Sequence, residues 1–476
     1  MQAGGEMATY SFEMITLAQA LSITATDELS FATGSARDMT ALFVPGAPDT
    51  VVLVLDGRSV TFGAPITSVS GAGHISFADG SRLYLGTPAA DSPAAGGLQN
   101  DAFFGGEGAD TLNGGGGANL LQGNTGADQL AGGAGADTIY GGQDNDLIVT
   151  GDGVNFGQGN KGNDSIAGGL GADTLLGGQG DDTISSGAVS FQPDGANFLN
   201  GNLGDDFIRA GNGNDQIFGE AGNDTLDAGY GDSFVDGGDG QDSIEAQLGF
   251  NTIFGGTGDD TISSQSARIS QLDGGAGDDQ IYGAGMLAGG DGDDTLNGSA
   301  GDGQFTGATL DGGLGNDVIG AGNENDSLSG GDGDDTLYGA SGFDTLTGGQ
   351  GIDLFQFRSG DASLFAAAPT RHDVISDWSG QDCLTFASGG SPDSLTRAVA
   401  GAASNYVELS AADFASAQTA AAGQEVAGKL YVAVQVGQDV IVFANMLGFS
   451  PTGSEGVFLV GRSLNDIDFT NIVGAS

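Results

Sequence analysis

Large apolar residues recur every nine positions through the middle of the chain, in phase with a run of aspartates. In the stretch GGDGDDTLYGASGFDTLTGGQGIDLFQF (330–357), the apolar residues Leu337, Leu346 and Phe355 each follow an aspartate by two positions. A helix repeats its apolar positions at about 3.6 residues and a half-buried strand at about two, so neither element alone gives this pattern. The period predicts a repeat in which a short strand alternates with a turn.

The repeat runs from Gly105 to Gln356, and its eighth position is apolar in almost every unit. Numbered from the first unit, the odd units place there Leu112, Leu130, Ile148, Ile166, Ile184, Ile208, Leu226, Ile244, Ile262, Ile281, Leu296, Ile319, Leu337 and Phe355. The even units place there Leu121, Ile139, Gly157, Leu175, Leu199, Ile217, Val235, Ile253, Leu272, Leu287, Leu310, Leu328 and Leu346. We expect these side chains to form one continuous core, with Gly157 as its gap.

Insertions and deletions interrupt the repeat only on turns of even units. They fall at 186–191, 264–273, 283–288 and 298–311. The inserted loops are either candidate contact surfaces or neutral variation, and the sequence favours neither.

The repeat region carries most of the negative charge. Residues 105–356 hold 41 acidic and three basic residues, and the whole chain has a formal net charge of −52. This charge argues against nucleic acid or an anionic membrane surface as a partner. A disordered acidic linker is the alternative, but a disordered chain does not hold apolar residues at a fixed phase. The single cysteine, Cys383, excludes an intrachain disulfide, and no apolar run is long enough to span a bilayer.

The units GGEGADTLN, GGAGADTIY and GGQGDDTIS show the consensus G-G-x-G-x-D-x-U-x, where U is a large apolar residue. This consensus resembles the RTX nonapeptide repeat, and the match covers just over half of the chain. The resemblance implies an all-β fold, a right-handed parallel β-roll (a β-solenoid) in which two units complete one coil. It also implies that six residues of each unit form a calcium-binding turn and three form a strand. The sequence therefore predicts about fourteen coils over residues 98–357.

The sixth position of the repeat supplies the candidate metal ligands. In the odd units it is always aspartate: Asp110, Asp128, Asp146, Asp164, Asp182, Asp206, Asp224, Asp242, Asp260, Asp279, Asp294, Asp317, Asp335 and Asp353. The even units carry aspartate at Asp137, Asp173, Asp215, Asp326 and Asp344, and Asn or Ser at most other turns. We expect a continuous row of Ca²⁺ ions along the edge of the odd turns and a partly metallated opposite edge.

Stacked aspartates require a counter-charge. Coils stack at the strand spacing of about 4.8 Å, so neighbouring carboxylates repel by about 1 kcal/mol in water and by several times more when partly buried. Over a dozen such contacts the repulsion rivals a folding free energy of about 5–15 kcal/mol. Ca²⁺ accepts about six to eight oxygen ligands, including backbone carbonyls, whereas Mg²⁺ demands a stricter octahedron. We therefore expect the repeat to fold only when Ca²⁺ is bound.

Residues 1–97 read as a small β-rich domain. The runs VVLVLDGRSVTF and HISFADGSRLYLG each place an Asp-Gly turn (Asp56-Gly57 and Asp79-Gly80) between strand-like segments. The domain is either an assembly or partner-binding module or a cap over the first coil. No Lys or Arg precedes Arg37, so the N-terminal segment is not an ordinary secretory signal.

Residues 358–476 resemble the C-terminal module of serralysin-type RTX proteins. HDVISDWSGQDCLTF (372–386) fits D-x-I-x-D-F-x-x-G-x-D-x-I, with Trp378 in place of Phe. Asp377 and Asp382 are either further calcium ligands or caps, and Cys383 is expected as a buried thiol. Short helices are expected in 391–402 and 410–423, and a strand pair about Gly437-Gln438. The closing segment resembles those that carry an uncleaved type I secretion signal, which implies an extracellular or cell-surface location.

The sequence contains no catalytic motif that we accept. The only histidines are His74 and His372, so no HExxH zinc site exists, and GQEVAGK (423–429) lacks the Ser or Thr and the helix of a phosphate-binding loop. The favoured interpretation is a secreted, non-enzymatic calcium-binding protein that assembles with copies of itself into an S-layer, a surface sheet or a matrix fibre. Cell-surface polysaccharide is a second candidate partner. The alternative is a soluble adhesin or effector, and an enzyme carried in residues 1–97 is the least favoured.

Overall fold

The structure is a computed structural model of the chain, and it forms two compact units, residues 1–237 and 238–476, which are described separately. It describes residues 7–44, 50–187, 195–265, 270–298, 307–358, 373–387, 406–411, 416–417, 419–421, 424, 431–444 and 455–472.

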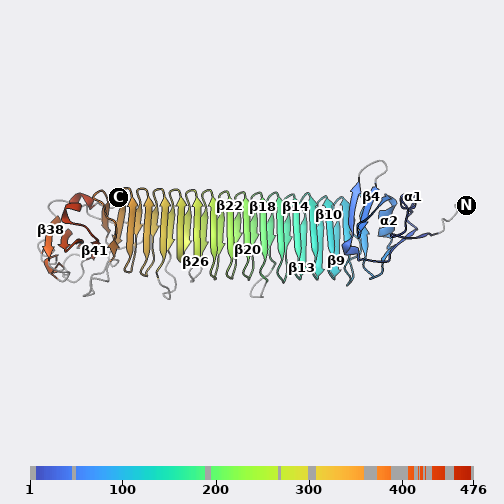
Figure 1. Ribbon diagram of the computed structural model, residues 1–476, viewed down its shortest axis with the longest axis horizontal. Coiled ribbons are helices and arrows are strands. Elements are labelled where there is room, and N and C mark those ends of the chain that lie inside the picture. The colour runs from blue at the N-terminus through green and yellow to red at the C-terminus, as the bar shows by residue number, and fades with distance from the viewer. Residues whose placement is uncertain are drawn as a thin grey trace. The chain divides into compact units, whose positions relative to one another are not determined.

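In unit 1 each nine-residue repeat contributes one strand, and the strands stack in parallel as successive rungs of two sheets (Figure 1). The even sheet contains β8 (Ala102–Glu107), β10 (Leu120–Thr125), β12 (Thr138–Gln143), β14 (Phe156–Lys161), β16 (Thr174–Gln179), β18 (Phe198–Leu203) and β20 (Gln216–Ala221). The odd sheet contains β9 (Thr111–Gly116), β11 (Gln129–Ala134), β13 (Leu147–Asp152), β15 (Ser165–Ala167), β17 (Thr183–Ser185), β19 (Phe207–Arg209) and β21 (Thr225–Asp227). Leu121 pairs with Ile139, two repeats along, so two units complete one coil.

Unit 2 has the same architecture. Its even strands are β24 (Thr252–Thr257), β26 (Ser270–Ala276), β28 (Gly285–Asp291), β30 (Thr309–Leu314), β32 (Ser327–Asp332), β34 (Thr345–Gln350) and β36 (Val374–Ile375), and β22 (Phe234–Asp239) spans the boundary between the units. Its odd strands are β23 (Ser243–Ala246), β25 (Thr261–Ser264), β27 (Gln280–Gly283), β29 (Thr295–Gly298), β31 (Val318–Gly320), β33 (Thr336–Tyr338), β35 (Leu354–Arg358) and β37 (Cys383–Ala387). The predicted all-β class and parallel β-solenoid are confirmed.

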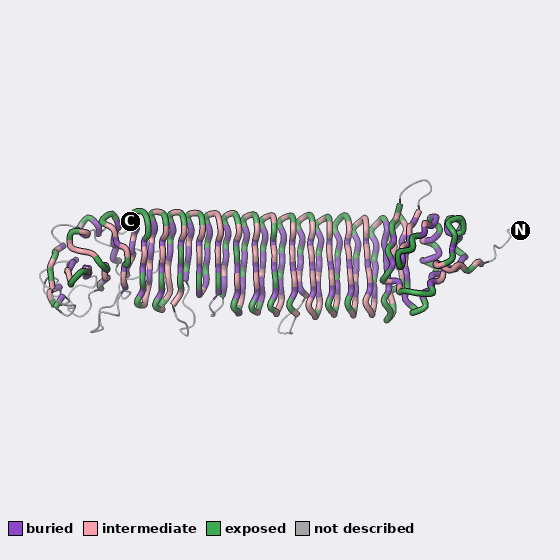
Figure 2. Tube along the Cα trace, viewed as in Figure 1, coloured by how far each residue is buried: buried purple, intermediate pink, exposed green. Residues whose placement is uncertain are grey.

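The predicted apolar column is the core of both units. Every apolar residue at the eighth repeat position is at most 2% exposed, and buried and exposed positions alternate along the strands (Figure 2). The gap at Gly157 is filled by its neighbours, because a Cβ atom added there would lie 2.9 Å from Cγ2 of the buried Thr150.

The coils extend beyond the fourteen expected from the sequence. In unit 1, β7 (Leu83–Leu85) pairs in parallel with β8, and in unit 2, β36 and β37 pair in parallel with β34 and β35. These outer strands follow segments without the nonapeptide glycines, so the consensus could not find them.

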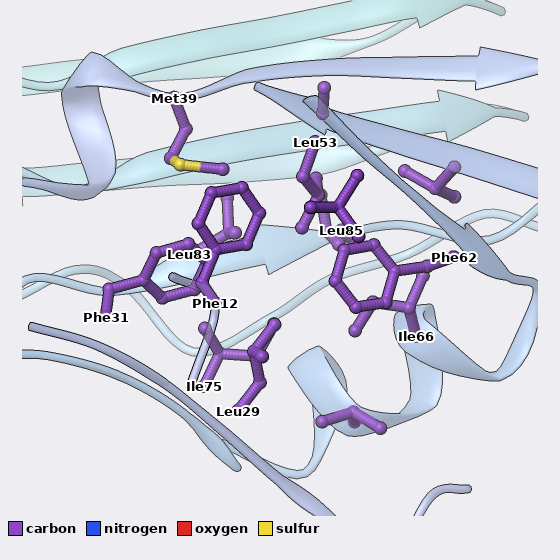
Figure 3. Packing of buried hydrophobic residues seen from close by; sticks show 14 of the residues in the cluster. Phe12, Leu29, Phe31, Met39, Leu53, Phe62, Ile66, Ile75, Leu83 and Leu85 are labelled. Atoms are coloured by element: carbon purple, nitrogen blue, oxygen red, sulfur yellow. The ribbon is translucent and has the colours of Figure 1, made fainter. Parts of the chain in front are cut away.

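The N-terminal part of unit 1 surrounds its own core. It comprises β1 (Thr9–Ser11), α1 (Leu17–Leu21), β2 (Glu28–Phe31), η1 (Ala36–Asp38), β3 (Thr40–Val44), β4 (Thr50–Leu55), β5 (Arg58–Gly63), α2 (Pro65–Gly71) and β6 (Ile75–Phe77). Its buried side chains, Phe12, Phe31 and Phe62 among them, form one cluster with Leu83 and Leu85 (Figure 3). This cluster also includes Ala102 and Phe104 of β8, so the domain covers the first coils as a cap would.

One of the two expected hairpins forms. Strands β4 and β5 pair antiparallel about Asp56 and Gly57, which have φ values of 50° and 76°. The second prediction was wrong as a strand pair, because β6 joins β2 in one sheet whereas β7 joins β8 in the roll. A turn still forms at Asp79-Gly80, and the Asp79 carboxylate accepts hydrogen bonds from the backbone and hydroxyl of Ser81.

The C-terminal part of unit 2 adds a mixed sheet to the even strands, in which one strand pair is parallel and two are antiparallel. It contains β38 (Tyr406–Ala411), β39 (Tyr431–Val436), β40 (Asp439–Ala444), β41 (Glu455–Leu459), η2 (Leu464–Asp466) and η3 (Phe469–Asn471). The expected strand pair about Gly437 is confirmed as β39 and β40, and β41 pairs with β36 of the roll. Of the two expected helices, 391–402 lies outside the described residues, and 416–417 and 419–421 within the second are helical.

Candidate metal sites

The sixth-position aspartates lie at the corners of the coils, where each turn meets its strand, and every one is buried. The backbone N–H of Asp110 donates to Oδ1 of Asp128 on the next coil at 2.7 Å. The same bond, at 2.7–3.1 Å, links the odd-unit aspartates Asp110 to Asp224 in unit 1 and Asp242 to Asp353 in unit 2. We call these two rows the odd edge, and the corners before the even strands the even edge.

For eleven aspartates of the odd edge the second carboxylate oxygen, Oδ2, is buried without a hydrogen-bond donor. Among the described residues this holds for Asp110, Asp128, Asp146, Asp164, Asp182, Asp206, Asp260, Asp279, Asp294, Asp317 and Asp335. A buried charged oxygen without a partner costs several kcal/mol or takes up a proton, so each of these corners calls for a cation.

A glycine five residues before each odd-edge aspartate makes room for its carboxylate. A Cβ atom added to Gly141 would clash with Oδ2 of Asp146 and would lie 2.8 Å from the carbonyl oxygen of Gly159 on the next coil. The carboxylate oxygen and this carbonyl therefore face the same small space. Oxygen atoms of both kinds are ligands that Ca²⁺ accepts.

On the even edge, the asparagine side chains form hydrogen bonds with backbone groups of the roll. Oδ1 of Asn155 accepts the N–H of Asp137 at 2.9 Å, as an aspartate would, but its Nδ2 donates to the carbonyl of Gly151 at 2.8 Å. Asn119, Asn197 and Asn251 also donate Nδ2 to carbonyls of their own turns. The N–H group of the amide thus lies where a carboxylate oxygen would need a cation beside it. An asparagine corner therefore needs no cation.

The five even-edge aspartates fall into different environments. Asp137 resembles the odd edge, because its Oδ2 is buried without a donor and Gly132 precedes it by five residues. Oδ2 of Asp173 and of Asp326 accepts a backbone N–H, from Gly169 and Gly322, each at 3.2 Å.

Asp215 and Asp344 occupy the same corners and join the same row. Oδ1 of Asp215 accepts the N–H of Asn197 at 2.8 Å, and Oδ1 of Asp344 accepts that of Asp326 at 2.8 Å. The structure therefore favours cation binding along the odd edge and at Asp137, and gives Asp173 and Asp326 the least need of it.

Burial raises the pKa of most odd-edge aspartates in the metal-free chain. Loss of solvation, reinforced by neighbouring carboxylates on adjacent coils, raises the pKa of Asp128 and Asp182 to about 7 and that of Asp146 to about 8. The pKa of Asp110, Asp206 and Asp335 rises to about 6. A cation would replace the proton that these values favour.

The donor set is oxygen only. Among the described residues no group of three or more His, Cys, Asp and Glu side chains gathers around one point. A cation held here would take one or two corner carboxylates and complete its shell with turn carbonyls. This set fits Ca²⁺ and fits Zn²⁺ poorly, since zinc sites use His and Cys.

Two aspartates of the C-terminal motif act as caps in this structure. The Asp377 carboxylate accepts the N–H groups of Gly348 and Gly349 at 3.0 and 2.7 Å. Asp382 accepts the N–H of Ser379 at 2.6 Å and that of Asp353 at 3.4 Å, so it also ends the odd edge. Cys383 is half-buried rather than buried as expected, because it points out of β37 while Leu384 points inward.

Sequence reasoning missed two corners at the start of the roll. Asp91 donates its N–H to Oδ1 of Asp110, and Asp101 donates to Oδ1 of Asn119. Their own Oδ2 atoms accept N–H groups, from Thr87 at 2.6 Å and from Gly97 at 2.9 Å, so both rows end at satisfied carboxylates. The only signal in the sequence was their spacing of 19 and 18 residues from Asp110 and Asn119.

No helix among the described residues is long and apolar enough to cross a membrane.

The comparison with protein families agrees with the geometry. The sequence profile of the family described as RTX calcium-binding nonapeptide repeat (4 copies) matches residues 94–121, 113–148, 122–157, 149–184, 194–226, 221–252, 236–266, 270–285, 286–307, 309–328 and 320–355, together more than half of the chain. Among solved structures, the chain is similar to the extracellular lipase LipA from Serratia marcescens, at 20% identity and a TM-score of 0.18. The match covers 65% of this chain and 39% of the lipase chain. No curated protein matches the chain.

Proposed function

Since the chain belongs to the family of RTX calcium-binding nonapeptide repeats, we propose that it is a secreted calcium-binding protein that folds on export and serves as a self-assembling structural component outside the cell. Type I secretion would export the chain, and the exported chain would then form a surface layer, sheet or fibre.

The observation that carries this proposal is the odd edge. Among the described residues, eleven of its carboxylates are buried with Oδ2 unpartnered, and nine of these, Asp146 among them, lie beside a glycine carbonyl of the next coil. In a compartment poor in Ca²⁺ the charges oppose stacking of the coils, and outside the cell Ca²⁺ removes that opposition. The same chain can therefore cross the membranes unfolded and fold afterwards.

A structural role is supported by how much of the chain is repeat. Stacked coils contact mainly their neighbours, and such arrays give stiff, extended bodies with long flat faces. On the odd sheet of unit 1, Leu147 and Val149 point outward side by side on β13 and are exposed. Exposed apolar side chains on a charged face are typical of surfaces that contact another molecule.

Electron microscopy after addition of Ca²⁺ to the metal-free protein tests the assembly role. Ordered arrays or filaments are expected. Single, monodisperse particles would favour the second candidate, a soluble secreted binding protein. That candidate is supported by the cleft of unit 1 described below.

We also propose that the chain is not an enzyme. The sequence contains no catalytic motif that we accept, and His74 and His372 are its only histidines. Hydrolase activity of the full chain towards ester, peptide or glycoside substrates would contradict this part of the proposal.

A further inference from the structure

A cleft lies in unit 1, between the N-terminal β3–β4 pair and the outer face of the even sheet. Its volume is about 650 Å³, and strands β10, β12 and β14 supply its floor. Leu42 and Val44 of β3 form part of one wall and are 58% and 39% exposed. Both the corner carboxylates and the apolar column lie apart from it, inside the coils.

The floor of this cleft is rich in amides and nearly neutral. Gln122 and Gln143 face it, and within the described part of the chain their side chains form no hydrogen bond. Glu107 and Lys161 line it as well, one negative and one positive charge. A neutral floor is unusual in a repeat region that carries 41 acidic and three basic residues.

Aromatic residues continue from the cleft along the outer face of the even sheet, with one interruption at β16, where Thr174 and Leu176 face outward. We define the track as Tyr140, Phe156, Phe198, Phe218 and Phe234, all half-buried. The ring centroids of Tyr140 and Phe156 lie 5.5 Å apart, and Phe218 lies 5.4 Å from Phe198 and 5.6 Å from Phe234. These residues alternate with core residues along their strands, so they point away from the core.

We propose that the cleft and the aromatic track bind an uncharged polysaccharide chain. Aromatic faces pack against the C–H faces of sugar rings, and amides both donate and accept, as hydroxyl groups do. A track that extends over several coils, interrupted only at β16, suits a linear polymer better than a compact ligand. The negative charge of the roll disfavours nucleic acid and other anionic polymers.

A second copy of the chain is the main competing occupant. It would bring its own net charge of −52 against this face, and it would leave the free amides of the cleft facing a mostly acidic surface. These considerations favour the polysaccharide.

The proposal rests on the proposed function in one respect, because the roll must be folded by Ca²⁺. It does not require assembly.

Affinity electrophoresis and calorimetry of the full chain in millimolar Ca²⁺ test the proposal, with dextran, mannan and laminarin as neutral probes and dextran sulfate as the anionic one. We expect binding to at least one neutral polymer and none to dextran sulfate. The double substitution Phe198→Ala and Phe218→Ala should weaken binding by about tenfold or more, because two stacking rings are lost. Gln122→Ala with Gln143→Ala, which alters only surface amides, should also weaken it.

Phe207→Ala is the matched control, since Phe207 is 46% exposed on the odd sheet. It should leave affinity within about twofold, and circular dichroism should show the same Ca²⁺ midpoint for every variant. Absence of binding to all neutral probes, or an equal loss in Phe207→Ala, overturns the proposal. The proposal is also overturned if sedimentation shows a dimer of the unchanged protein that the Phe198→Ala, Phe218→Ala variant does not form.

The same samples viewed by electron microscopy separate the two proposals. Arrays without polysaccharide binding contradict only the cleft proposal. Binding without arrays contradicts only the assembly role.

Discussion

At the scale of single residues, aspartate and asparagine at a corner differ in one atom and in what they require. Both accept the N–H of the preceding coil through Oδ1. The second atom is a donor in Asn155 and an unpartnered acceptor in Asp146. The all-aspartate row is therefore the part of the fold that depends on a cation, and the asparagine corners hold without one.

The glycine that precedes a corner by five residues should be as important as the aspartate. We predict that Gly141→Ala raises the Ca²⁺ concentration needed for folding and lowers stability by about 1–3 kcal/mol, because its methyl group takes the space of the Asp146 carboxylate. Gly320→Ala is the control, since a Cβ atom there meets nothing within 4 Å. Equal Ca²⁺ midpoints and urea midpoints for the two variants would show that this space is not critical.

Protonation should partly replace Ca²⁺. In the metal-free fold, burial and like charge raise the pKa of Asp128, Asp146 and Asp182 to about 7, about 8 and about 7, from 3.8. A group whose pKa is higher in the folded state stabilises the fold fully below its unfolded pKa, and this stabilisation is lost as the pH rises through the folded pKa. Calcium-free protein should therefore gain strand structure on acidification from pH 8 to pH 5.

Circular dichroism of the dialysed protein measures this effect. With Ca²⁺ present the dependence should reverse, because protons compete with the ion for the same oxygens. A calcium-free spectrum that stays constant from pH 8 to pH 5 would contradict the raised pKa values.

At the scale of the turn and strand, the residue five places before an asparagine corner sets how much room lies beside that corner. Asn119 has Gly114 at this position, whereas Asn155 has Thr150, which is buried and fills the space beside Gly157. The two asparagine turns thus look alike in sequence but differ in the room that they offer to a carboxylate.

This difference gives a matched pair of substitutions. Asn119→Asp should fold normally in millimolar Ca²⁺ and lose about 1–3 kcal/mol without it, because a buried oxygen replaces an amide that donates to Gly117. Asn155→Asp should be destabilised in both conditions, because Thr150 leaves no room for an ion. Urea unfolding with and without Ca²⁺ distinguishes them, and identical behaviour of the two variants would refute the role of the preceding residue.

The sequence predicted the elements of the repeat well because one short pattern sets both turn and strand. The strands around Leu121 and Ile139 pair in the expected register. The strand at Leu83 was assigned to a local hairpin, since an Asp-Gly turn is a strong local signal. Its pairing with β8 is decided by the apolar cluster that Leu83 and Leu85 share with Phe104, and no local pattern encodes that contact.

At the scale of the whole molecule, the negative charge of the repeat destabilises the fold that the apolar core stabilises. Residues 105–356 have a net charge of −38, from 41 acidic and three basic residues, while the core of each coil consists of little more than one large apolar side chain from each strand. A thin core of this kind becomes stable only when many coils stack. Stacking also brings the corner carboxylates together, so the same event that buries the core creates the need for the cation.

The composition and the repeat predicted this balance, but the cleft and the aromatic track could not be read from them. Tyr140 and Phe156 occupy variable positions of the nonapeptide, and the sequence does not show that β3 lies opposite them. Such a surface depends on which strands the N-terminal domain covers. That arrangement is a property of tertiary packing.

The most direct test of the central claim is the far-UV circular dichroism of the full chain during a Ca²⁺ titration at pH 8, starting from metal-free protein. We expect little strand signal at first and a cooperative gain of strand structure at millimolar Ca²⁺, with no such gain in equal Mg²⁺. A strand spectrum that is already complete without Ca²⁺, or that Mg²⁺ restores equally well, would contradict the account.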